Sequence, residues 1–239
     1  MFSFGEKRPI LFEFILVFLS FLVAGIFAGV GSAIGLHPSL SISLARVFVG
    51  IVLILIFRRI LAQGSPTSGL TYLAPALLFP IWNLFYNLSS GAQLGGTSYY
   101  LEALIVAAAP AIFEEVLFRG VFISNLKAAQ HSNLSSLLIS SVFFSLIHAT
   151  NVLEAEDLAT VALQVGYALV IGLVFGAIYL KNGSLTQLIV AHFLTDFTNH
   201  LYLNPATTAS TTQIAIFTVL LVAEAAYALW LTCSKTERA

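Results

Sequence analysis

Hydrophobic positions along the chain fall into long runs, separated by short breaks rich in glycine, proline and small polar residues. A helix needs about 20 mostly apolar residues to cross a bilayer, because each residue adds about 1.5 Å along its axis. Eight runs reach about this length, and we predict a transmembrane helix in each. Their approximate bounds are 10–31, 42–63, 70–90, 98–123, 134–150, 158–180, 184–203 and 212–233. The breaks contain turn residues, as in "KNGS" before the seventh run.

The composition also indicates a membrane protein. Of the 239 residues, 59% are hydrophobic and 9% are charged, whereas soluble domains carry about 25% charged residues. We therefore predict an all-α fold, a polytopic bundle of about eight transmembrane helices that forms one domain over residues 1–239. The first run is too long for the core of a signal peptide, so we expect it to be retained as a span.

The basic residues predict how the bundle is oriented, because Lys and Arg are enriched in cytoplasmic connections. With eight spans and a cytoplasmic N-terminus, the connections near 32–41, 91–97, 151–157 and 204–211 face outward and contain no Lys or Arg. The basic residues that then face the cytoplasm are Lys7, Arg8, Arg58, Arg59, Lys127, Lys181, Lys235 and Arg238. Both termini are therefore predicted to be cytoplasmic.

Cysteine usage and net charge exclude some classes of site and partner. The single cysteine, Cys233, excludes an internal disulfide and a cysteine-based metal cluster. The formal net charge of −1 gives no indication of a nucleic-acid partner. The apolar composition makes membrane lipid an expected partner.

Several ionisable residues fall within the predicted spans, where they need a partner or a path to water. Glu13 and Arg46 lie near span ends, from which a long side chain can reach the interface. Glu102 and His200 also lie toward an end, and interfacial placement is the commoner role for such residues. Glu224 lies deeper in the last span, with no partner evident from the sequence.

The fourth span contains the sequence "FEEVLFRG" (113–120) within an otherwise apolar run. Each charge at the centre of a bilayer costs at least about 2.5 kcal/mol on insertion scales. Glu115 and Arg119 are four residues apart, so they share a helix face and can form an ion pair. Glu114 points about 100° away from Glu115 and is left without a charge partner.

The fifth and seventh spans add polar residues at the same helical spacing. Phe144 and His148 are four residues apart, as are His192 and Asp196. Ionisable groups within a membrane normally face the bundle interior and find partners there. We therefore predict one shared polar chamber, with these members: Glu114, His148, His192 and Asp196.

Two kinds of hydrolytic chemistry suit such a chamber. A carboxylate and an imidazole can polarise a water molecule, and a second imidazole, an amide or a protonated carboxyl can donate to the resulting oxyanion. The same residue types are also ordinary ligands of zinc or iron, in which case Glu114, His148 and His192 would hold a divalent metal. The usual zinc-protease signature, two histidines and a glutamate on one helix, is absent.

With these three motifs the chain resembles the CPBP family, which comprises the CAAX proteases and bacteriocin-processing enzymes and is also called the ABI family. The family motifs, Glu-Glu-x-x-x-Arg, Phe-x-x-x-His and His-x-x-x-Asn/Asp, stand here as "EEVLFR" (114–119), "FSLIH" (144–148) and "HFLTD" (192–196). They occur in family order, and the resemblance covers roughly residues 98–203. It implies an intramembrane endopeptidase of the glutamate type that requires no cofactor, although a divalent metal such as zinc remains an alternative.

The resemblance also implies a role for each motif residue. Glu114 and His148 would activate the water, and His192 and Asp196 would form the oxyanion side. Glu115 and Arg119, together with Phe144, would support them. The prenyl-protein proteases have Asn where this chain has Asp196, and an ionised Asp would repel an oxyanion. Asp196 must therefore be protonated or must orient His192.

The expected substrate is a membrane-presented peptide or protein, either lipid-modified or a leader peptide, and the expected location is the plasma (inner) membrane of a prokaryote. Two other functions compete with this one. The first is a non-catalytic immunity or scaffold protein of the same fold, which has no need for buried motif residues. The second is a proton-coupled transporter, which would be expected to show inverted repeats and broken helices.

Overall fold

A computed structural model of the chain describes residues 5, 7–61, 69–154, 157–206 and 208–234. Helices account for almost all regular structure in these ranges, and the described residues contain no strand. A single isolated antiparallel bridge joins Leu94 to Tyr202. The predicted all-α fold is confirmed.

The α-helices in the described part of the chain are α2 (Pro9–Ala33), α3 (Pro38–Leu61), α4 (Leu78–Ser89), α5 (Thr97–Glu114), α6 (Ser124–Ala128), α7 (Asn133–Ile147), α8 (Leu158–Asn182), α9 (Leu185–Asn199) and α10 (Thr211–Cys233). Short 3₁₀ turns precede α4 and follow α7, namely η1 (Leu70–Leu73), η2 (Pro75–Leu77) and η4 (His148–Glu154). The segment η3 (Glu115–Ile123), which joins α5 to α6, is a π-helix.

A helical segment stands at each predicted span, although the helices differ in length. Five are long and apolar enough by themselves to cross a membrane, and they cover Pro9–Ala33, Pro38–Leu61, Asn133–Val152, Leu158–Asn182 and Thr211–Cys233. The other three predicted spans correspond to the shorter helices α4, α5 and α9. Of these, α5 continues without a break into η3. The protein is therefore an integral membrane protein.

Polar side chains fix where several helices begin. The Ser132 side chain accepts from the Ser135 amide at the start of α7, and Ser210 forms a capping box with Gln213 at the start of α10. At the start of α8, Asp157 accepts from the amides of Ala159 and Thr160, both at 3.0 Å. Hydrogen bonds from the Thr160 side chain and backbone also lower the pKa of the Asp157 carboxyl. These bonds satisfy amides that have no partner within a helix.

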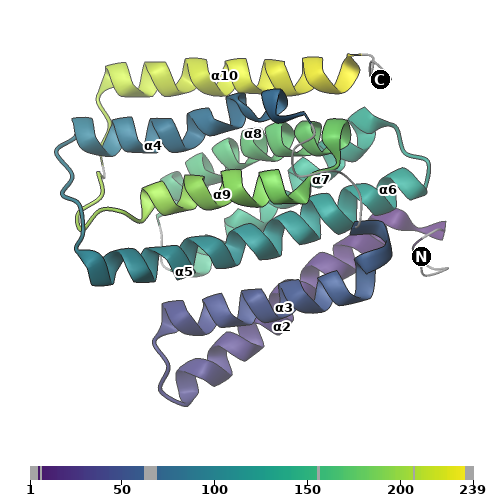
Figure 1. The fold of residues 1–239 in the computed structure, drawn as a ribbon, viewed down its shortest axis with the longest axis horizontal. Helices are drawn as coiled ribbons and strands as arrows, with labels where there is room; N and C mark the ends of the chain where they lie inside the picture. Colours follow the sequence, from purple (N-terminus) through teal and green to yellow (C-terminus); the bar gives the residue numbers. More distant parts are fainter. Residues whose placement is uncertain (1–4, 6, 62–68, 155–156, 207, 235–239) are drawn as a thin grey trace.

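The helices lie side by side, with the α2–α3 hairpin on one side of the bundle and α10 on the other (Figure 1). The deepest part of the core is η3, all nine residues of which are buried. Helices α3, α7, α8 and α9 all contact η3. By contrast, α2, α3 and α10 expose large apolar side chains such as Phe18 and Val219, as expected of helices that face lipid.

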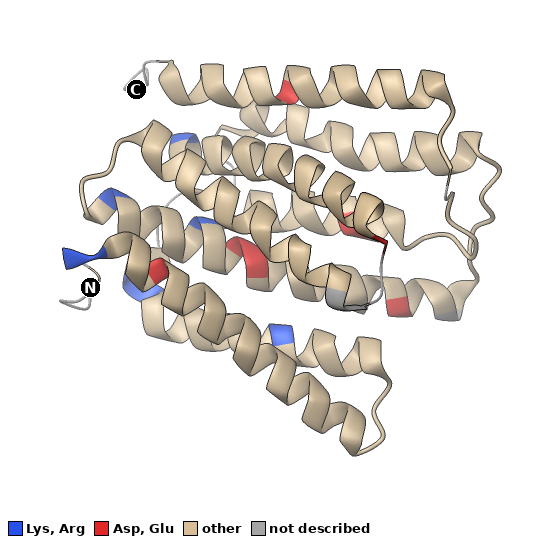
Figure 2. Cartoon of the chain, turned by 180° about the vertical axis from the view of Figure 1, so that it is seen from behind, with Lys and Arg blue, Asp and Glu red and all other residues tan. Residues whose placement is uncertain are grey.

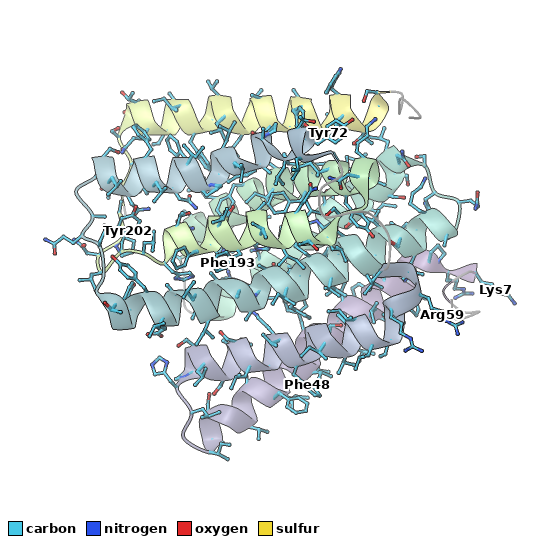
Figure 3. The ribbon with its side chains drawn as sticks, in the orientation of Figure 1. Lys7, Phe48, Arg59, Tyr72, Phe193 and Tyr202 are labelled. Carbon is cyan, nitrogen blue, oxygen red and sulfur yellow. The ribbon has the colours of Figure 1, made fainter. Side chains whose placement is uncertain are left out.

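Most Lys and Arg residues gather at the end of the bundle where α2 begins and α10 ends (Figure 2). Figure 3 shows Lys7 and Arg59 at this end and Tyr202 at the opposite one. Lys181, near the end of α8, donates to the Ser234 carbonyl at 2.7 Å, which ties the ends of α8 and α10 together. The charge distribution therefore follows the predicted asymmetry, while the side that faces the cytoplasm stays a prediction.

The expectation that Glu13 reaches the membrane interface is wrong. Its side chain is completely buried, and Asn125 Nδ2 on α6 donates to Glu13 Oε1 at 2.7 Å. Because α2 packs against α6 at this level, one carboxylate oxygen has an amide partner, while Glu13 Oε2 is buried without a hydrogen bond from another described residue.

Candidate active site

The first motif lies where the backbone changes from α-helix to π-helix. Glu114 is the last residue of α5, and Glu115 is the first of η3. The uninterrupted α-helix predicted from the apolar run is wrong from Glu115 to Ile123, where the backbone is a π-helix. π-Helices are rare in proteins, and those that do occur are often found at functional sites. The Ser140 hydroxyl of α7 donates to the Phe118 carbonyl within this segment at 3.1 Å.

Glu115 joins the first motif to the third. Its Oε1 accepts from Arg119 Nη1 at 2.8 Å and from His192 Nδ1 at 2.7 Å. The predicted Glu115–Arg119 ion pair is therefore present, with its two side chains 0% and 1% exposed. The link to His192 was not predicted, because residues 77 positions apart carry no mutual spacing signal. A buried charge pair needs such additional hydrogen bonds.

His192 also faces the other two carboxyl groups of the predicted set. Its Nε2 lies 4.0 Å from Glu114 Oε2 and 3.5 Å from Asp196 Oδ2. Glu114, which the sequence left without a charge partner, thus has His192 as a neighbour that carries a charge only when both ring nitrogens are protonated. Since a carboxylate can only accept, the contact with Glu115 requires a proton on Nδ1. The structure thus brings three carboxyl groups around one imidazole that is almost fully buried.

Phe144 packs against the basic groups of all three motifs. Its ring centroid lies 4.3 Å from Arg119 Cζ, which is a cation–π contact. The same ring lies edge-on to His148 at 5.0 Å and to His192 at 6.2 Å between centroids. Phe144 is thus the residue through which the second motif contacts the other two.

Phe175 of α8 forms a second aromatic wall that the sequence analysis missed. Its ring lies 5.5 Å from Arg119 Cζ and 6.0 Å from the His192 ring. One phenylalanine within a long apolar run has no pattern that marks it as part of a site.

His148 begins η4, directly after α7 ends, and its side chain is half-buried. Its Nδ1 lies 2.8 Å from the Phe144 carbonyl oxygen. Because a carbonyl oxygen only accepts, this bond places a proton on Nδ1. The second nitrogen of a neutral His148 ring is then a hydrogen-bond acceptor.

A metal centre is not supported by the described side chains. These contain no group of three or more His, Cys, Asp and Glu residues placed to hold one metal ion. Glu114, His148 and His192 do not form such a group, and the alternative metal site at these residues stays a prediction that metal removal tests.

The remaining ionisable residues of the spans lie apart from this cluster. His200 is exposed at the end of α9, and Glu102 is exposed near the start of α5. Glu224 is buried on α10, with its side chain forming no ion pair to another described residue.

A comparison with known protein families agrees with the family resemblance inferred from the three motifs. Residues 96–198 match the family described as Rce1-like, type II CAAX prenyl endopeptidase. This range contains all the residues of the cluster described above, and the match confirms the family resemblance that the motifs predicted. Comparisons with curated proteins and with solved structures found no match.

Proposed function

We propose that this chain, whose residues 96–198 match the Rce1-like CAAX endopeptidase family, is an intramembrane endopeptidase that hydrolyses peptides with water activated by Glu114 and His148. One observation carries the proposal most strongly. Side chains of three motifs, from three different helices, meet around His192 and Phe144 in the buried centre of the bundle. Placing ionisable groups within the membrane costs free energy, and ionisable groups found there usually serve a function.

In the proposed reaction, the oxygen of a water molecule attacks the carbonyl carbon of the scissile bond while Glu114 accepts one water proton. His148 orients the same water through its Nε2, because its Nδ1 proton is held by the Phe144 carbonyl. The carbonyl π electrons move onto oxygen to give a tetrahedral oxyanion. Glu114 then returns its proton to the nitrogen as the C–N bond breaks.

We assign stabilisation of the oxyanion to the His192 side of the cluster. The Glu115 carboxylate holds the Nδ1–H of His192 at 2.7 Å and thereby fixes the ring. Asp196 Oδ2 lies 3.5 Å from Nε2, where it can accept from an N–H on that ring nitrogen. A doubly protonated imidazole is a hydrogen-bond donor to developing negative charge. Asp196 is thus assigned to orienting His192. It does not need to contact the oxyanion itself, so the repulsion between an ionised Asp and the oxyanion is avoided.

The proposed substrate is a peptide segment presented at the membrane. The cluster is packed among helices long and apolar enough to cross a membrane, and the matched family is described by prenyl endopeptidase activity. A prenylated C-terminal peptide is therefore the first substrate to test, and an unmodified leader peptide is the second.

The test uses the purified chain in lipid nanodiscs with a prenylated peptide, the same peptide without the lipid, and a leader peptide. We expect cleavage by wild type and a loss of about 10²-fold or more for Glu114→Gln and for His148→Ala. The matched controls are Glu224→Gln, a buried carboxyl outside the cluster, and His200→Ala, an exposed imidazole directly after the end of α9. Both controls should retain wild-type rates.

Added chelator should leave the cleavage rate within about twofold, because the proposed water activation uses side chains alone. Near-normal cleavage by Glu114→Gln would contradict the proposed base. Loss of activity on chelation, with recovery on adding zinc, would favour a metalloprotease instead.

A further inference from the structure

A second polar cluster lies far from the motif residues, between the first turn of α3 and the first part of α5. The Ser39 hydroxyl donates to Glu102 Oε1 at 2.9 Å, and His37 Nδ1 lies 2.7 Å from Ser39 Oγ. Because Ser39 uses its own proton on Glu102, it accepts from His37 Nδ1–H. These residues line a hollow of about 270 Å³ together with Leu40, Ile105 and Val106.

The hollow has a carboxyl group but no basic partner for it. Among the described residues, no Lys or Arg side chain lies within ion-pair distance of Glu102. The connections at this end of the bundle also lack Lys and Arg in the sequence. Ser39 leaves the second Glu102 oxygen available, and a neutral His37 ring offers Nε2 as another acceptor. The polar end of the hollow therefore suits a small cation that can donate hydrogen bonds.

One basic residue lies deeper on the same side of α3. Helices α3 and α5 run parallel, since Ser39 contacts Glu102, 63 positions later, and Gly50 faces Ile112 and Phe113. In this register Arg46 lies level with residues 108–109, and it shares the helix face of Ser39, two turns earlier.

Arg46 is half-buried and has no ion-pair partner among the described residues. Arg46 is not among the residues that line the hollow. Long side chains on a helix lean toward its N-terminus, so a guanidinium group at this position can reach toward the hollow from below. An unpaired arginine at membrane depth is well suited to bind a phosphate group.

The surroundings of the hollow indicate lipid as the source of such a ligand. Large apolar side chains next to it in sequence are exposed, including Leu44, Phe48, Leu101 and Ile105. Phe48, labelled in Figure 3, packs its ring against Phe27 of α2, with 4.9 Å between the ring centroids. A hollow with polar residues at its outer end and apolar residues around it matches a head group followed by acyl chains.

We propose that this hollow binds a zwitterionic phospholipid with a primary ammonium group, such as phosphatidylethanolamine. The ammonium group donates to Glu102 and the phosphate pairs with Arg46. The acyl chains then pack on Leu40, Ile105 and Val106. A choline head group fits less well, because its quaternary nitrogen has no N–H to donate to the carboxylate. In a phosphatidylethanolamine molecule the phosphate lies deeper than the ammonium group, which is the order of Arg46 and Glu102.

The test measures lipid retention by the purified full-length chain with native mass spectrometry, after delipidation and addition of one lipid class at a time. The lipids are phosphatidylethanolamine, phosphatidylcholine and phosphatidylglycerol with identical acyl chains. For wild type we expect phosphatidylethanolamine to bind about tenfold more tightly than phosphatidylcholine, which corresponds to one charge-assisted hydrogen bond. Glu102→Gln should abolish that preference, and Arg46→Gln should weaken the binding of all three lipids.

Matched controls lie outside the hollow. Asp157→Asn removes another exposed carboxyl group at the same end of the bundle, and Arg58→Gln removes an arginine at the other end of α3. Neither should change lipid retention. Ile105→Trp fills the hollow without removing a charge, and it should lower phosphatidylethanolamine binding even if a charge variant folds poorly.

Three outcomes would overturn the proposal. The first is equal retention of phosphatidylethanolamine and phosphatidylcholine by wild type, and the second is an unchanged preference in Glu102→Gln. The third is a preference for phosphatidylglycerol over phosphatidylethanolamine, which would mean that Arg46 alone recruits an anionic head group.

Discussion

One oxygen atom of Glu115 organises the candidate site. Glu115 Oε1 accepts from Arg119 Nη1 and from His192 Nδ1, at 2.8 Å and 2.7 Å. The arginine therefore does more than neutralise a buried carboxylate, because it also limits where the carboxylate can hold the imidazole. Glu114 and Asp196 then approach the opposite nitrogen of the same ring. The two adjacent glutamates of the motif thus contact different atoms of His192.

At the residue scale, two substitutions of Asp196 test whether its side chain orients His192 for catalysis. Asp196→Asn keeps an oxygen that can accept from His192 Nε2, so we expect the cleavage rate to stay within about tenfold of wild type. Asp196→Ala removes that acceptor and should lower the rate by about 10- to 100-fold. The measurement is kcat and KM for both variants on the same peptide. A wild-type kcat in Asp196→Ala would show that this contact does not orient the histidine.

At the scale of single elements, the π-helix η3 holds two supporting residues of the site, Glu115 and Arg119. The i, i+4 spacing predicted their ion pair correctly although the backbone is not α-helical there. Nothing in "EEVLFRG" marks a π-helix, because the segment depends on packing from neighbouring helices. One such contact is the Ser140 hydroxyl of α7, which donates to the Phe118 carbonyl.

Ser140→Ala should therefore affect activity beyond its effect on stability. Loss of the hydroxyl leaves a buried carbonyl without this donor, at a cost of about 1–3 kcal/mol. We expect a lower unfolding temperature together with a reduced kcat, because Glu115 and Arg119 lie in the same segment. Ser145→Ala is the matched control, since Ser145 on the same helix donates to the Val165 carbonyl at 2.7 Å, away from η3.

Ser145→Ala should lower the unfolding temperature by a similar amount and leave kcat unchanged. Equal kcat in the two variants, measured at a temperature where both are folded, would show that Ser140 serves stability alone. Ser140→Thr keeps the hydroxyl group and should recover kcat if its added methyl group is accommodated.

Element bounds were largely predictable from the sequence, whereas contacts between elements were not. The predicted span 98–123 begins within one residue of α5 and ends with η3, although the helix itself continues through α6 to Ala128. The predicted span 184–203 extends past the end of α9 at Asn199, since Tyr202 is buried in a bridge to Leu94 and not in a helix. A hydrophobic run predicts that its residues are buried, but it does not show whether they are buried in a helix or in an extended segment.

The candidate site shows the same limit. Motif spacing predicted two contacts, because the residues of each pair lie about one helical turn apart. The first pair is Phe144 and His148, and the second is His192 and Asp196. The contact of His192 with Glu115 and the wall formed by Phe175 depend on how separate helices pack. Packing of this kind has no local sequence signal, so these contacts became visible only in the folded chain.

At the scale of the whole molecule, charge is segregated between the two ends of the bundle. Lys7 and Arg59 lie at one end, while the connection containing Leu94 and the bridge to Tyr202 lies at the other (Figure 3). The positive-inside rule predicts that the basic end faces the cytoplasm. The candidate site lies between the two ends, in the buried core.

Cysteine labelling tests this orientation. In a Cys233→Ser background, Gln93→Cys should react with a membrane-impermeant maleimide in intact cells, and Lys7→Cys should react only after the cytoplasmic side is opened. Both positions are exposed, so access depends on the side of the membrane. Labelling of Lys7→Cys in intact cells would reverse the predicted orientation, and labelling of both would contradict the span count.

The central claim is that water attacks the peptide bond directly within the Glu114, His148 and His192 cluster. Its most direct test is a single turnover, with enzyme in excess over peptide, in water enriched in ¹⁸O. Mass spectrometry of the fragment that carries the new carboxyl group should show one ¹⁸O atom after the first turnover, and Glu114→Gln should form almost no product. A first-turnover product that contains only ¹⁶O would contradict the account, because its new oxygen would have come from a side chain of the enzyme.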